Sequence, residues 1–199
     1  MTKQSRGRGM RPFTLVEVLV VTGIICIIAV LIVVGYNGVY RSWSVRNTVA
    51  AMKNVHLVLE RFRLENGYLP IESSPVALSY STSASDPALK ALARDLLQSV
   101  HPYAKDFGGT VKVFDDFGSN TDSGKVRSLY YIYPYSDTGT FALISLGKDG
   151  AWGGDDDIIY LPAGLSGKKL PPGFYLVSLN DDESGVIQSS SDDIEPLVN

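Results

Sequence analysis

The sequence contains a single cysteine, Cys26, and only two histidines among its 199 residues. One cysteine excludes an intramolecular disulfide, and so few thiol and imidazole groups argue against a structural zinc site. A small domain that lacks disulfides relies instead on a well-packed core or on a bound metal of another kind.

Basic side chains are scarce beyond the first twelve residues. Lys3, Arg6, Arg8 and Arg11 stand in that stretch without an acid, and the rest of the chain has 14 basic against 21 acidic side chains, a net charge of −7. A nucleic-acid-binding surface needs clustered Lys and Arg, so we expect no nucleic-acid partner.

The length of the chain suits one ordinary domain with an appendage.

A long apolar run covers residues 15–34 and is interrupted only by Glu17, Thr22 and Gly23. At about 1.5 Å per residue, twenty helical residues cross a hydrocarbon layer of roughly 30 Å. The basic residues before the run place the amino terminus in the cytoplasm and the remainder outside. A cleaved signal peptide is the alternative, but its apolar region is normally about 7 to 15 residues and ends at a small-residue site, and neither feature is found here.

Glu17 lies inside this apolar run, where a carboxylate is costly and is by default a functional candidate. The alternative is an acid near the helix end that reaches headgroup water. The surrounding segment FTLVEVLVV, residues 13–21, resembles the processing and assembly motif of type IV pilins and type II secretion pseudopilins. The resemblance implies that a prepilin peptidase cleaves between Pro12 and Phe13 and methylates the new terminus, although the family usually has glycine before the cut. It also implies that Glu17 attracts the terminal amine of a neighbouring subunit during assembly.

The helical pattern continues well beyond the apolar run. Apolar residues recur at steps of three and four, namely Val45, Val49, Met52, Val55, Leu59 and Phe62. This stripe predicts packing on a globular head. Gly67 and Pro70 predict the helix end near Glu65, so the helix from residue 13 is on the order of 80 Å long. The segment VLERFRLENGYLP, residues 58–70, also resembles the helix end of major pseudopilins.

The remaining sequence predicts an α+β head with a small antiparallel sheet laid against the long helix. We expect a surface loop over 71–86, a helix that begins at Asp86-Pro87, and strands over 111–114, 129–135 and 141–146. A further strand is expected over 174–179, and the acidic tail 180–199 is expected to be mobile. The predicted divisions are a leader 1–12, a membrane half 13–34, an amphipathic half 35–66, a head 67–161 and an extension 162–199.

A glycine-rich acidic loop, residues 146–157, carries the most specific chemistry of the head. Four aspartates stand within nine positions and would repel one another unless a cation neutralised them. Hard oxygen ligands on flexible glycine geometry favour Ca²⁺, which takes roughly six to eight oxygens. The spacing is not that of an EF-hand. A solvated acidic turn is the alternative.

The same loop, from Ser145 to Asp157, resembles the calcium loop of the type II secretion major pseudopilin. The resemblance implies side-chain ligands from Asp149, Asp156 and Asp157 and backbone carbonyl ligands from Leu146 and Ala151. Asp155 is an alternative to its neighbours, because the glycine-rich segment is slightly shorter here.

Together the resemblances imply a type IV pilin-like fold and a structural subunit of a type II secretion pseudopilus. Such a subunit sits in the bacterial inner membrane with a periplasmic head and is extracted into a helical filament, with sibling pseudopilins and an inner-membrane assembly platform as partners. A major or minor type IV pilin, for adhesion, motility or DNA uptake, is the alternative, although the paired cysteines common in true pilins are absent. A tethered calcium-dependent binding module is a third reading.

No enzyme activity is expected from the sequence. His56 and His101 have no nucleophile motif near them, so both are expected to be hydrogen-bonded or solvated.

Overall fold

The computed structural model describes residues 14–117, 127–136, 139–180, 182–188 and 194–197. The predicted cleavage pair, Pro12 and Phe13, lies outside these described residues. The chain is α+β, with an amino-terminal apolar helix and an antiparallel sheet. It divides into two compact units, residues 1–41 and 42–199. Helix α1, Leu15–Asn66, contributes to both units.

The first unit contains the apolar part of α1. The segment Leu15–Ile32 has a mean hydropathy of 3.0 and none of it is buried. It is long and apolar enough to cross a membrane, and signal sequences near an amino terminus share this property. Its one hydroxyl, on Thr22, donates to the carbonyls of Val18 and Leu19 at 2.9 and 3.0 Å. That polar group is therefore satisfied inside the helix, as an apolar surrounding requires.

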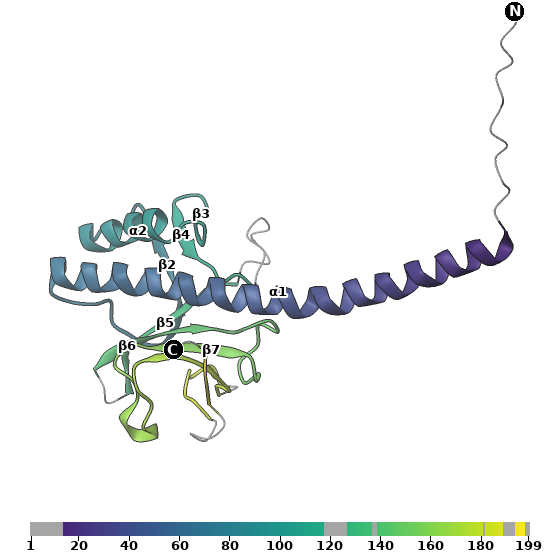
Figure 1. Ribbon diagram of the computed structural model, residues 1–199. Helices are drawn as coiled ribbons and strands as arrows, with labels where there is room; N and C mark the ends of the chain where they lie inside the picture. Colours follow the sequence, from purple (N-terminus) through teal and green to yellow (C-terminus); the bar gives the residue numbers. More distant parts are fainter. Residues whose placement is uncertain (1–13, 118–126, 137–138, 181, 189–193, 198–199) are drawn as a thin grey trace, which may run out of the picture. The chain divides into compact units, whose positions relative to one another are not determined.

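In the second unit, the carboxyl half of α1 supplies one wall of the main core. The predicted apolar stripe of α1 is confirmed. Val45 is partly buried, and the other members are buried: Val49, Met52, Val55, Leu59 and Phe62. These side chains share one apolar cluster with α2 (Pro87–Ser99) and with the strands described below. Figure 1 shows this half of α1 between α2 and the larger sheet.

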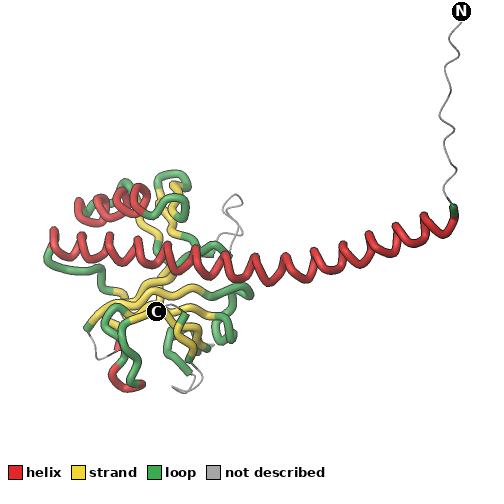
Figure 2. Tube along the Cα trace, in the orientation of Figure 1, coloured by secondary structure: helices red, strands yellow, loops and turns green. Residues whose placement is uncertain are grey.

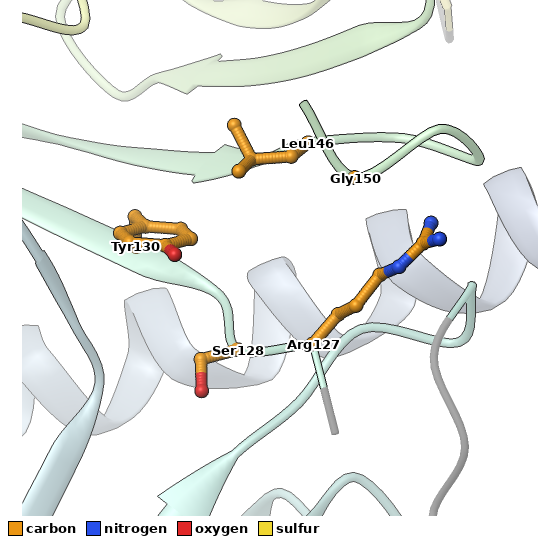
Figure 3. A pocket seen from close by; sticks show the side chains of 5 residues that line it. All are labelled: Arg127, Ser128, Tyr130, Leu146 and Gly150. Carbon is orange, nitrogen blue, oxygen red and sulfur yellow. The ribbon is translucent and has the colours of Figure 1, made fainter. Parts of the chain in front are cut away.

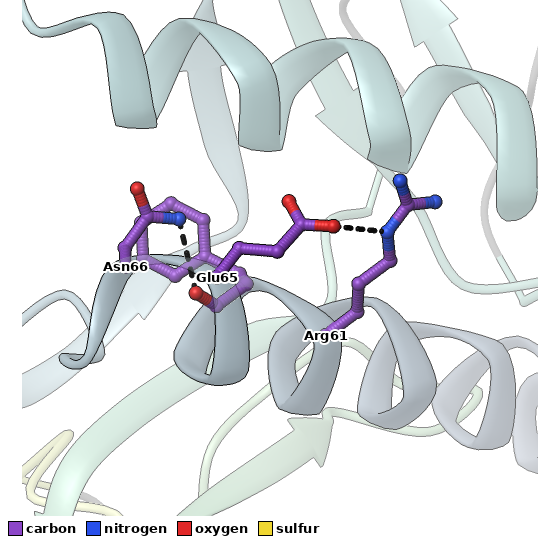
Figure 4. A network of polar contacts seen from close by, with 4 residues as sticks. Arg61, Glu65 and Asn66 are labelled. Carbon is purple, nitrogen blue, oxygen red and sulfur yellow. Dashed lines mark hydrogen bonds and ion pairs between the residues drawn. The ribbon is translucent and has the colours of Figure 1, made fainter.

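The end of α1 follows the predicted signals. Gly67 adopts a φ of +78°, a conformation that favours glycine, and its N–H donates to the backbone carbonyl of Arg63 at 2.8 Å. The Asn66 side-chain amide donates to a carbonyl one turn earlier at 3.0 Å, and Arg61 pairs with Glu65 at 2.8 Å (Figure 4). The last turn therefore satisfies part of its own polar groups before the chain enters the head.

The larger sheet has six strands in the order β1-β5-β6-β7-β8-β9, and every neighbouring pair is antiparallel. Its strands are β1 Glu72–Ala77, β5 Tyr130–Tyr135, β6 Thr140–Ser145, β7 Asp157–Leu161, β8 Gly173–Val177 and β9 Glu195–Pro196. Both faces are buried: Phe141 and Leu143 join the cluster with α1, whereas Ala142 and Ile144 join a second cluster. Burial on both faces explains why β6 is a continuous apolar run rather than an alternating one.

A smaller antiparallel sheet, in the order β2-β4-β3, accompanies α2 (Figure 2). Its strands are β2 Ser79–Ser81, β3 Ala104–Asp106 and β4 Thr110–Val113. As predicted, Asp86 caps α2 and accepts a hydrogen bond from the N–H of Ala88 at 2.8 Å. Leu92, Ala93 and Leu96 form the buried face of α2.

The prediction of a surface loop over 71–86 was wrong for most of this segment, because β1 and β2 lie within it, whereas residues 82–86 do form a turn before α2. Both strands pair through their backbones, so Ser- and Pro-rich sequence does not prevent pairing. β1 is an edge strand, where Pro75 is tolerated. The predicted strands over 111–114, 129–135 and 141–146 correspond to β4, β5 and β6, whereas β3, β7 and β9 were not predicted.

The carboxyl-terminal part of the chain belongs to the head. β8 overlaps the strand predicted over 174–179, starting and ending earlier, and it pairs with β7 along five residue positions. The expected division between 161 and 162 therefore falls inside the sheet. Ile187 and Ile194, which fall in the tail expected to be mobile, are buried in the second cluster. Apolar residues in an acidic, Ser-rich segment thus cover the outer face of the sheet.

Candidate cation loop and amino-terminal carboxylate

The acidic loop connects two neighbouring strands of the larger sheet. β6 ends at Ser145 and β7 begins at Asp157, and Ser145 lies opposite Ile158 in their antiparallel register. The two ends of the loop are therefore held next to each other. This closure brings aspartates that are up to eight positions apart in the sequence into one small region.

Asp157 is the most constrained carboxylate of the loop, with none of its surface exposed. Its Oδ2 accepts weak hydrogen bonds from the N–H groups of Gly153 at 3.3 Å and Leu179 at 3.4 Å, whereas its buried Oδ1 has no partner among the described residues. Burial raises the pKa of Asp157 to about 7; the two backbone donors oppose this rise, and Asp149 and Asp156 add to it. A buried carboxylate oxygen without a partner requires an explanation, and a bound cation is one.

Asp149 and Asp156 converge on Gly154. A Cβ atom at Gly154 would lie 2.6 Å from Oδ2 of Asp149 and 2.9 Å from Oδ1 of Asp156. The other oxygen of each carboxylate is held by a backbone N–H: Ala151 donates to Asp149 at 2.9 Å, and Lys148 donates to Asp156 at 2.7 Å. The missing side chain of Gly154 thus leaves room where two carboxylate oxygens meet.

The remaining predicted ligands are less well placed. The carbonyl of Leu146 accepts a hydrogen bond from Gly150 at 3.0 Å, and Ala151 and Asp155 are exposed. Within the described ranges, no group of three or more His, Cys, Asp or Glu side chains is arranged to hold one metal ion. The loop therefore brings two predicted carboxylates together with Asp157 near them. All the predicted ligand atoms are oxygens, and such a set fits a hard cation such as Ca²⁺ better than it fits zinc.

Three residues that support this loop were not predicted: Asp115, Arg127 and Ser145. Asp115 and Ser145 are fully buried, and the Ser145 hydroxyl donates to Asp115 at 3.0 Å and accepts from the N–H of Gly147 at 3.3 Å. Arg127 donates to backbone carbonyls of the loop. The sequence signals were the position of Ser145 at the start of the matched loop, of Asp115 after one predicted strand and of Arg127 before another.

Glu17 occupies the first turn of α1 and is exposed. Its Oε2 accepts from the N–H of Thr14 at 2.9 Å and from the Thr14 hydroxyl at 3.0 Å, and that hydroxyl in turn accepts from the N–H of Glu17 at 3.3 Å. This reciprocal pattern is a capping box, which satisfies free N–H groups at a helix start. Glu17 therefore has a local role that the sequence analysis did not anticipate.

The two histidines lie in different surroundings. His56 packs between the rings of Phe141 and Tyr160, with centroid distances of 5.7 and 5.4 Å. Its buried Nδ1 has no hydrogen-bond partner among the described residues, so the expectation of a satisfied histidine is wrong at this atom. Burial lowers the pKa of His56, and the charge of Glu60 partly opposes that effect. His101 is exposed.

Comparisons with known proteins yield no relative: no protein-family model, no curated protein and no solved structure matches the chain.

Proposed function

We propose that this chain is a structural subunit of a type II secretion pseudopilus with a type IV pilin-like fold. The observation that carries the proposal is a carboxylate, Glu17, in the first turn of an apolar helix segment that is exposed along its whole length. So large an exposed apolar surface needs lipid or other apolar helices around it. A simple membrane anchor needs this acid only for its capping box with Thr14, whereas a filament subunit also uses its charge to recognise the neighbouring subunit.

In the proposed assembly, the carboxylate of Glu17 pairs with the amine that cleavage frees on Phe13 of the adjoining subunit. Among the described residues, Glu17 accepts from the neutral donors of Thr14 alone. Exchanging these donors for a charged amine adds the attraction between two opposite charges to the hydrogen bond, because both partners are then ionised. The gain is larger where water is excluded, so packing of the apolar helices and charge pairing reinforce each other.

The acidic loop gives the proposed head a second source of stability. Ca²⁺ held by Asp149, Asp156 and Asp157, with carbonyl oxygens from Leu146 and Ala151, would stabilise the folded head by mass action, because the unfolded chain has no preformed site. The buried Oδ1 of Asp157, which has no hydrogen-bond partner in the described part of the chain, supports this part of the proposal. Calcium is abundant outside the cytoplasm, so the loop tightens where the head is proposed to work, in the periplasm.

The proposed partners follow from this role. They are further copies of the chain in a helical filament, sibling pseudopilins, an inner-membrane assembly platform and a prepilin peptidase. The described residues include no pair of cysteines, which favours the secretion branch over a true type IV pilin.

Substitution of Glu17 tests the proposal. Glu17→Gln keeps an oxygen acceptor for Thr14 and hence the capping box, but it removes the charge. We expect this variant to insert into the membrane like the wild type and to form filaments at least about tenfold less efficiently, because a buried charge pair has lost one partner. Glu17→Val removes both the charge and the capping box, and it should assemble no better than Glu17→Gln. Filaments and membrane-bound subunits are counted by electron microscopy and by fractionation with crosslinking.

Glu65→Gln is the matched control, since it removes an exposed carboxylate from the same helix outside the apolar segment. It should assemble normally. If Glu17→Gln assembles as well as the wild type, the charge is not the recognition element, and the capping box alone accounts for Glu17.

A further inference from the structure

The side chain of Arg127 lies against the acidic loop (Figure 3). Its Nη1 donates to the carbonyl of Gly147 at 2.8 Å and also to the carbonyl of Lys148, and its Nη2 donates to the carbonyl of Asp149 at 3.4 Å. Three consecutive carbonyls of the loop therefore turn toward one guanidinium. The planar fork of arginine suits this task, because it presents several donors in fixed directions.

Gly150 provides the space for this contact. A Cβ atom at Gly150 would lie 2.7 Å from Nε and 2.8 Å from Cζ of Arg127. Its φ of +69° is also in the left-handed region, which disfavours other residues. Glycine at this position therefore lets the guanidinium lie directly against the loop backbone.

The backbone of Arg127 is itself fixed by the neighbouring sheet. Its carbonyl accepts from the N–H of Asp115 at 3.0 Å, and Ser128 forms an antiparallel bridge with Phe114 directly after β4. Asp115 also anchors the start of the loop through the Ser145 hydroxyl. Two connections, one from Arg127 and one from Asp115, thus hold the same loop from one side of the head.

We propose that Arg127 is a positioning residue that prearranges the cation site: it holds the loop carbonyls so that the carboxylates of Asp149 and Asp156 stay together before a cation binds. Asp149 shows the two roles separately: its carbonyl accepts from Arg127, while its carboxylate, like that of Asp156, lies close beside Gly154. The proposal rests on the cation binding put forward above, and it adds the residue that prepares the site. It also assigns the carbonyls of Gly147, Lys148 and Asp149 to the guanidinium and excludes them from the cation's ligands.

A competing effect has the opposite sign. Arg127 carries a positive charge near the proposed cation, and charge repulsion alone would weaken calcium binding. Removal of Arg127 therefore tightens binding if repulsion dominates and weakens it if prearrangement dominates. Outer-shell residues that orient metal ligands typically contribute a factor of about 10 to 100 in affinity.

The test compares Arg127→Gln and Arg127→Lys with the wild type, using the full chain in detergent micelles. Arg94→Gln is the control, because it removes one positive charge from the exposed face of α2. Hydrogen exchange of the Lys148, Gly150 and Ala151 amides is measured in EDTA, and Ca²⁺ affinity is measured by calorimetric titration with the metal alone. Gly150→Ala is a second variant that displaces the guanidinium while keeping Arg127.

We expect Arg127→Gln to lose exchange protection at these amides in EDTA and to bind Ca²⁺ about tenfold or more weakly. Arg127→Lys should restore neither property, since an ammonium on a flexible stem lacks the planar fork that directs several donors at the loop carbonyls. Gly150→Ala should behave like Arg127→Gln. Unchanged protection in EDTA overturns the proposal, and so does tighter Ca²⁺ binding or full rescue by lysine. If the wild type binds no Ca²⁺, the proposed metal role fails, and the exchange measurements in EDTA alone decide whether Arg127 positions the loop.

Discussion

His56 illustrates how one buried polar atom can be used to test the core. It packs between two aromatic rings, and its Nδ1 lies away from water without a partner among the described residues. A neutral imidazole tolerates such a position better than an imidazolium does, which is why burial lowers the pKa of His56. In the unfolded chain the same group titrates near about 6.5. The unfolded state therefore binds the proton first as the pH falls, and the folded state loses stability below that pH.

Replacement of His56 by Phe removes both the orphaned nitrogen and this titration. We expect the free energy of unfolding to rise by about 1 kcal/mol at pH 7, because an unsatisfied buried group is removed. We also expect less loss of stability between about pH 6.5 and 5 than in the wild type. Urea unfolding of the full chain across this pH range measures both effects. His101→Gln, at an exposed position, should reproduce the wild-type curve, and an acid limb that is unchanged in His56→Phe would exclude His56 as its cause.

At the scale of single elements, the loop between β6 and β7 depends on a residue with no side chain. A methyl group at Gly154 meets the carboxylate ends of Asp149 and Asp156, which can rotate away at little cost to the backbone. Gly154→Ala should therefore leave the metal-free protein nearly as stable as the wild type. Its calcium affinity should fall about tenfold or more, because the two carboxylates are forced from their positions.

Thermal unfolding in calcium and in EDTA separates these effects. In the wild type we expect calcium to raise the midpoint, since it binds only the folded state. Gly154→Ala should show the same midpoint in EDTA and a smaller rise in calcium. Gly167→Ala is the control, because a Cβ atom there meets nothing within 4 Å. Equal rises in wild type and Gly154→Ala would show that this space is not part of the cation site.

The helices and strands also show which parts of the fold can be predicted from local sequence patterns. Local spacing in the sequence predicts three features: the apolar stripe of α1, the cap of α2 and the apolar run of β6. All three are found in the structure. β1 and β2 have no such pattern, because their Ser- and Pro-rich chains are held by backbone pairing with strands elsewhere in the sequence. β7 starts inside the acidic loop at Asp157, so its first residue reads as part of a turn.

The same distinction applies to the candidate site. Its aspartates stand close together in the sequence, whereas Arg127 reaches the loop from about twenty positions away. Contacts of that kind depend on strand register, which a local pattern does not contain.

At the scale of the whole head, the larger sheet needs cover on both faces. The face toward α1 is covered by the helical stripe, and the opposite face is covered in part by the carboxyl-terminal segment through Leu179, Ile187 and Ile194. Leu179, two residues after the end of β8, forms an antiparallel bridge with Ile187, which holds Ile187 next to that strand. The acidic composition of residues 180–199 hides this role, because only a few apolar side chains carry it.

Adjacent residues of the segment provide a matched pair for testing this cover. Ile187 is 3% exposed and Val186 is 51% exposed. Ile187→Ala should lower the free energy of unfolding by about 2 to 4 kcal/mol, since it leaves a cavity in the second cluster. Val186→Ala should change it by less than about 0.5 kcal/mol, because an exposed side chain loses few contacts. Urea unfolding of both variants in the full chain gives the comparison, and equal small effects would mean that the segment moves freely and the outer face is covered by other residues.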